Sequence, residues 1–116
     1  MDAEFDFPAF LNSLDGLSHI EIRLRAESKH AEMRPLSDMR SRRKRNGVEV
    51  RVLASRMQAR MADLLCWLDT GTRPGSMPIE DFLRMEPICR ALIARGEFKS
   101  AAALDIFTEA RAEIAR

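Results

Sequence analysis

The chain has 116 residues, of which 46% are hydrophobic and 32% are charged. This length fits one globular domain and is too short for two. The formal net charge of +1 excludes a globally basic nucleic-acid binder and a strongly acidic disordered chain.

The composition favours helices over strands. Ala, Leu, Arg, Glu and Met fill 60 of the 116 positions, whereas Val and Thr supply three residues each and Tyr none. Strong helix formers therefore dominate, and β-branched residues are scarce. The sequence predicts an all-α fold: a single irregular bundle of four or five helices spanning residues 1–116.

The N-terminal segment, residues 1–16, is acidic and aromatic. Pro8 suits the first turn of a helix and Gly16 the position after its end, which predicts a short helix at about 8–15. The apolar spacing favours packing over the core. The alternative is an apolar docking motif for a partner, formed by Phe5, Phe7 and Phe10.

A second helix is expected over about 18–33. Ser18 and Glu21 have the spacing of a capping box, and Pro35 disfavours helical geometry at Arg34, which predicts the helix end there. Its predicted apolar stripe consists of Leu17, Ile20, Leu24 and Ala31.

A strand interpretation competes with helix in two segments. Apolar and charged residues alternate from Ile20 to Ala26 and again at Val48, Val50 and Val52, after Asn46-Gly47. The alternative fold is therefore α+β, with a small two-stranded element near 19–26 and 48–53. The long intervening loop and the overall composition favour the all-α fold.

The clearest helical pattern covers about 48–69 and ends at Gly71. A loop follows at 70–75, because glycines, threonines and a proline are concentrated there. The inward residues of the pattern recur at spacings of three and four: Leu53, Met57, Met61, Leu64 and Leu68. Met57 and Met61 also suggest a homodimer contact through this helix, although core packing is the commoner fate of such a stripe.

The C-terminal third predicts two or three more helices. Ser76 is placed to cap a helix that Pro87 should kink or split into 77–86 and 87–95, with Gly96 as its stop. The last helix is expected at about 98–115.

The nearly neutral net charge conceals an uneven distribution of charge along the chain. Residues 1–33 carry −4, residues 34–60 carry +7, and residues 61–116 carry −2. The basic connecting segment, 34–47, contains most of the cations that form the candidate partner or phosphate-binding site: Arg40, Arg42, Arg43, Lys44, Arg45 and the following Arg51.

These cations indicate a binding function with two candidate targets. Arginine can grip phosphate with two hydrogen bonds, so nucleic acid is one alternative. No aromatic residue interleaves the cluster to stack bases, and a protein partner is the preferred prediction. The acidic residues Asp2, Glu4 and Asp6 carry charge opposite to the cluster and form a hypothetical internal competitor for its ligand.

Catalysis and cofactor binding are not indicated. The sequence has no phosphate-binding loop, nucleophile elbow or HExxH motif, and we predict no enzyme activity, no cofactor and no metal. Cys66 and Cys89 are interpreted as reduced, buried thiols, and His19 and His30 would lie about 16 Å apart on one helix, too far to share a metal.

The expected location is the cytoplasm, without a membrane partner. The first residues are acidic where a signal peptide is cationic, and no run of about eighteen apolar residues exists. The sequence thus predicts a small, non-catalytic interaction or regulatory protein.

Overall fold

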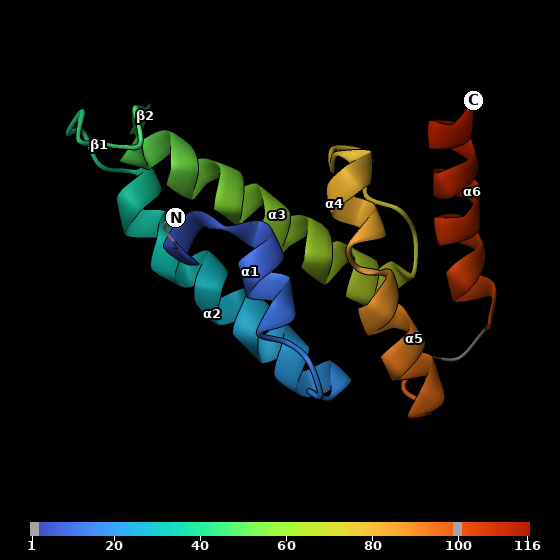
Figure 1. Cartoon of the computed structure of the whole chain (residues 1–116). Helices are drawn as coiled ribbons and strands as arrows, with labels where there is room; N and C mark the ends of the chain where they lie inside the picture. Colours follow the sequence, from blue (N-terminus) through green and yellow to red (C-terminus); the bar gives the residue numbers. More distant parts are fainter. Residues whose placement is uncertain (1–2, 99–100) are drawn as a thin grey trace.

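A computed structural model describes residues 3–98 and 101–116, and it is mostly helical (Figure 1). This confirms the all-α prediction. The elements, in chain order, are the 3-10 helix η1 (Ala3–Phe5), α1 (Phe7–Asn12), α2 (His19–Ser37), β1 (Lys44–Arg45), β2 (Val48–Glu49), α3 (Val50–Thr70), α4 (Ile79–Leu83), α5 (Glu86–Ala94), the 3-10 helix η2 (Ala101–Leu104) and α6 (Asp105–Ala115).

The long helices α2 and α3 run side by side in opposite directions and form the framework of the bundle (Figure 1). The capping box predicted at the start of α2 is present, with Ser18 accepting from the Glu21 amide and Glu21 accepting from the Ser18 amide. At the end of α3, Gly71 takes the left-handed conformation (φ 68°) that glycine adopts without strain.

The predicted inward stripe of α2 is wrong. Ile20 and Leu24 are 67% and 57% exposed, Ala31 is exposed, and Leu17 lies before the helix. Because the first turns of α2 carry apolar residues on two opposite faces, their spacing does not decide which face packs on α3. The buried side chains of α2 are Ile22, Ala26 and Met33.

The predicted end of α2 at Arg34 is also wrong, because the helix continues through Pro35 to Ser37. Pro35 removes one amide donor from the helix. Three residues later, the amide of Asp38 still donates to the Arg34 carbonyl at 3.0 Å. The Ser37 hydroxyl donates to the same carbonyl at 2.9 Å. Two hydrogen bonds to the Arg34 carbonyl therefore hold the last turn after the proline.

The alternative pairing of 19–26 with 48–53 is wrong, since residues 19–26 are helical and α3 begins at Val50. A two-stranded ladder does form, between nearer partners: Lys44 pairs with Glu49 and Arg45 with Val48. Asn46 and Gly47 make the turn, with φ of 52° and 78°. Two left-handed residues are what a two-residue hairpin turn needs, so Asn-Gly dictates a local hairpin.

The stripe predicted for α3 is confirmed at Met57, Met61, Leu64 and Leu68, which are buried, while Leu53 is half-buried. The two cysteines differ from each other. Cys89 is buried as predicted, but Cys66 is exposed, because it lies on the face of α3 that turns away from the core.

Helices α4 and α5 reproduce the predicted break near Pro87, with shifted boundaries. Pro87 lies in the first turn of α5, where its missing donor costs no helical bond. Ser76 does not cap α4, whose first residue follows Pro78; its hydroxyl donates instead to Asp63 at 3.0 Å. The expected stop at Gly96 is present, with φ of 74°.

The C-terminal helix is shorter than predicted: α6 begins at Asp105, after η2, and residues 99–100 lie outside the described part. Aromatic side chains join it to the bundle. The rings of Phe82 and Phe107 stack at 4.5 Å, and Trp67 meets Phe98 and Phe107 edge-on at 5.2 and 6.1 Å. Burial of these rings fixes α4 to α6 against the C-terminal half of α3.

Candidate binding surface

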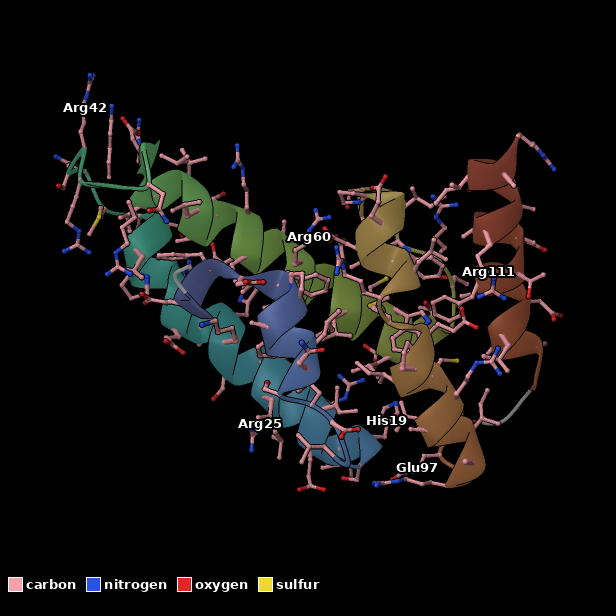
Figure 2. All side chains as sticks on the ribbon, in the orientation of Figure 1. His19, Arg25, Arg42, Arg60, Glu97 and Arg111 are labelled. Carbon is pink, nitrogen blue, oxygen red and sulfur yellow. The ribbon has the colours of Figure 1, made fainter. Side chains whose placement is uncertain are left out.

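The basic segment is displayed at one extremity of the molecule. Figure 2 shows Arg42 at the tip beyond α2 and α3, far from Arg111 on α6. We call residues 40–49 the basic hairpin. It projects because its two-residue turn reverses the chain between the ends of the two longest helices.

The predicted site residues fall into two groups. Arg40, Arg42, Arg43 and Lys44 are exposed, and no carboxylate within residues 3–98 and 101–116 lies at ion-pair distance from them. Unpaired cations in water keep their charge for a partner without first breaking an internal bond. These four residues are therefore the part of the predicted set that is free to bind an anion.

Arg45 belongs to the second group because it is paired within the chain, although its side chain is 40% exposed. Its guanidinium donates to the Glu4 carboxylate at 2.8 Å and lies 5.5 Å from the centre of the Phe5 ring. A cation over an aromatic face and beside a carboxylate is stabilised by both. Arg45 ties the N-terminal segment to the basic hairpin.

Arg51 is also paired, with Glu49 at 2.7 Å. The hydrogen bond from Arg51 lowers the pKa of Glu49, assisted by the positive charges of Arg51, Arg42 and Lys44 and opposed by partial burial. Glu49 thus remains ionised and offsets part of the positive charge at the base of the hairpin.

The acidic N-terminal residues were hypothesised to pair with the basic cluster. Glu4 does so, through Arg45. Asp6 has another role, since its carboxylate accepts from the Ala9 amide at 3.0 Å and caps α1. Asp2 lies outside the described residues. The internal pairing therefore engages the one hairpin arginine that points back toward the bundle.

Next to the basic hairpin lies an open groove of about 600 Å³, between the N-terminal segment, the hairpin, α3 and the start of α4. Sequence inspection missed this groove, because its walls come from four segments that are distant in the chain. Its apolar lining consists of Phe5, Phe7, Pro8, Val48, Leu53, Met57 and Pro78.

Charged groups rim the same groove. Arg45, Arg56 and Arg60 line it together with Asp6 and Asp81. Arg56 is exposed and has no ion-pair partner within the described chain, whereas the other two arginines are paired. The groove therefore combines an apolar floor with a mixed rim of three arginines and two aspartates, on which Arg56 is the arginine without an ion-pair partner among the described residues.

A buried polar cluster supports this rim. Arg60 and Asp63 are 16% and 12% exposed, and their charged groups are 3.3 Å apart. The second Asp63 oxygen accepts from the Ser76 hydroxyl, and Arg60 also donates to the Ser76 carbonyl at 3.4 Å. Helix spacing of three residues places the arginine beside the carboxylate. These bonds tie the loop after α3 to the middle of the helix.

The three aromatics of the predicted docking motif differ in accessibility. Phe7 is 6% exposed and packs in the core, whereas Phe5 and Phe10 are half-buried. Phe5 faces the groove, and Phe10 lines a separate surface depression with Leu24. Phe7 also lines the groove from its buried position, so Phe5 is the one of the three that is both partly exposed and next to the basic hairpin.

The suggested homodimer contact does not fit its two named residues. Met57 and Met61 are 2% and 0% exposed, so they pack inside the protein.

Among the described residues, no three histidine, cysteine or acidic side chains are grouped as metal ligands. In the same part of the chain, no helix is long and apolar enough to cross a membrane.

Comparisons with known proteins give no match: no family model, curated protein or solved structure is significantly similar to this chain.

Proposed function

We propose that this protein is a non-catalytic interaction protein that binds an acidic segment of another protein through the basic hairpin. The observation that carries the proposal is the cluster of exposed cations Arg40, Arg42, Arg43 and Lys44, which have no ion-pair partner among the described residues and lie at one end of the antiparallel helices α2 and α3. Neighbouring exposed cations of this kind are complementary to the charge of an acidic ligand.

Two features favour a protein over a nucleic acid as the partner. The described surface of the hairpin has no exposed aromatic ring on which a base can stack. The adjoining groove is mostly apolar, which suits side chains of a protein and not a phosphate backbone.

Nucleic acid is the second candidate, because consecutive exposed arginines suit phosphate groups. Such binding would be dominated by counterion release, and its affinity would fall steeply with salt. With three or four phosphate contacts, an increase from 50 to 200 mM salt would weaken binding by about one hundredfold.

The two candidates are separated by direct binding of defined probes. Fluorescence anisotropy would compare labelled polyglutamate with an oligothymidylate of equal charge, over a range of salt. The test variant replaces Arg42, Arg43 and Lys44 with Gln. The control variant replaces three other exposed cations, Arg25, Arg84 and Arg116, with Gln and so loses the same charge.

We expect polyglutamate binding that the hairpin variant loses and the control variant retains. Stronger binding of the oligothymidylate, with the same dependence on the hairpin, would establish the second candidate. Equal losses in the two variants would show that net charge alone attracts the probe and would contradict the proposal.

A further inference from the structure

We infer that the groove beside the basic hairpin receives a bulky apolar side chain of the acidic partner segment, so that the ligand is an acidic sequence with an aromatic or leucine anchor. This inference rests on the proposed function and specifies its partner. It follows from the shape and lining of the groove, from the charge at its rim, and from a contact that the chain makes with itself.

The groove has the size and the chemistry for an anchor. Its volume of about 600 Å³ exceeds that of any single side chain, and Phe5, Leu53 and Met57 give it an apolar floor. Phe5 and Leu53 are half-buried, so a ligand would remove their remaining surface from water. Burial of that surface is the main source of affinity for an apolar anchor.

Arg56 and the adjoining hairpin cations favour acidic neighbours of the anchor. Arg56 is exposed beside Leu53, and it has no ion-pair partner in the described chain. The exposed hairpin cations extend this positive charge beyond the groove. A peptide that places its anchor over Leu53 would therefore have Arg56 and the hairpin cations within reach of its acidic residues, which would have to lie away from Asp6 and Asp81 on the groove wall.

The N-terminal segment provides an internal example of this recognition. Glu4 and Phe5 are consecutive, and Arg45 binds the carboxylate of one and the ring of the other. An acidic residue next to an aromatic residue is thus already complementary to this surface. The segment forms one wall of the groove and leaves the rest of it open.

The test uses the full chain and two labelled acidic peptides, which are identical except for one central residue, phenylalanine or alanine. We expect the phenylalanine peptide to bind the wild type about tenfold more tightly, the usual loss when an interface anchor is truncated. Leu53→Gln should remove that difference. Val52→Gln, at a half-buried position of the same helix outside the groove, should preserve it.

The outcomes distinguish the anchor from the underlying function. If both peptides bind equally well and Leu53→Gln has no effect, while replacement of Arg42, Arg43 and Lys44 abolishes binding, the groove assignment is overturned and the proposed function stands. If neither peptide binds, both are overturned. Tighter binding of an oligothymidylate than of either peptide also overturns the assignment, in favour of a phosphate backbone.

Discussion

The two ends of the molecule treat their cations differently. Around α5 and α6, Arg90 and Arg111 both pair with Glu86, and Arg73 pairs with Glu113. At the opposite end, the exposed cations of the basic hairpin have no such partners among the described residues. Arginines are thus paired within the chain at one end, whereas at the other end the exposed hairpin cations are unpaired among the described residues.

The difference also extends to the core. The C-terminal end is held by stacked and edge-on rings around Trp67, which is fully buried. The hairpin end has two-residue strands and a turn, followed directly by the fully buried Val50 at the start of α3. Stability and binding should therefore be separable by mutation.

The largest expected effect is on stability, at the aromatic end. Phe107→Ala removes a fully buried ring that stacks on Phe82, and should lower the free energy of unfolding by about 3–5 kcal/mol. Chemical denaturation measures this change. Ile114→Ala on the same helix is the control, because Ile114 is 53% exposed and its loss should cost less than about 0.5 kcal/mol. Similar losses in both variants would contradict the assigned core.

A smaller loss is expected at the buried pair beneath the groove. Asp63→Asn leaves the charge of Arg60 poorly compensated and should lower the free energy of unfolding by about 2–3 kcal/mol, less than for a fully buried pair. The double variant with Arg60→Met removes both charges and should recover part of that loss. If the two substitutions were simply additive, the two residues would not act as a pair.

Loss of a paired cation at the C-terminal end should cost less again. Glu86→Gln removes the charged partner of Arg90 and Arg111, whose side chains are 60% and 49% exposed. Because solvent screens such pairs, we expect a decrease of about 1 kcal/mol or less, reduced further by high salt. Thermal unfolding at low and high salt measures it; an effect independent of salt would contradict an ionic contribution.

The effect that is smallest at neutral pH concerns the two thiols, because it develops only in alkaline solution. Burial, with help from the charge of Glu86, raises the pKa of Cys89 from 9.0 to about 11. Between these values the unfolded chain loses the proton while the folded chain keeps it, so the free energy of unfolding should fall as pH rises above about 9. Cys89→Ala should remove this part of the pH dependence.

Reaction with a thiol reagent at neutral pH provides a second readout of the same two residues. Cys66 is exposed and should react in the folded protein, whereas Cys89 should react only after unfolding. Equal rates for the two thiols would contradict the burial of Cys89.

The sequence was sufficient where one local pattern determined the outcome. The Ser18 and Glu21 spacing predicted a capping box, and the apolar spacing of α3 predicted its buried face. Prediction from the sequence was wrong where two patterns competed. Apolar residues on both faces of early α2 hid the inward face, and a bias against helix before Pro35 was weaker than the bonds that continue the last turn.

The candidate site was predictable only in part. The charges of the basic segment are a property of the sequence, and its exposed cations follow from them. Which arginine turns inward depends on Asn46-Gly47, whose hairpin faces Arg45 toward Glu4 and Phe5, some forty positions earlier in the chain. The groove depends on contacts between four distant segments, which no local pattern encodes.

The central claim is that unpaired cations bind a partner while paired cations stabilise the fold. It is tested most directly by measuring polyglutamate affinity and unfolding free energy for two triple Gln variants, one at Arg42, Arg43 and Lys44 and one at Arg73, Arg90 and Arg111. The account predicts that the first loses binding with unchanged stability, and that the second loses stability with unchanged binding. The account would be contradicted if both variants lost polyglutamate affinity equally. It would also be contradicted if the hairpin variant had a lower free energy of unfolding and kept its polyglutamate affinity.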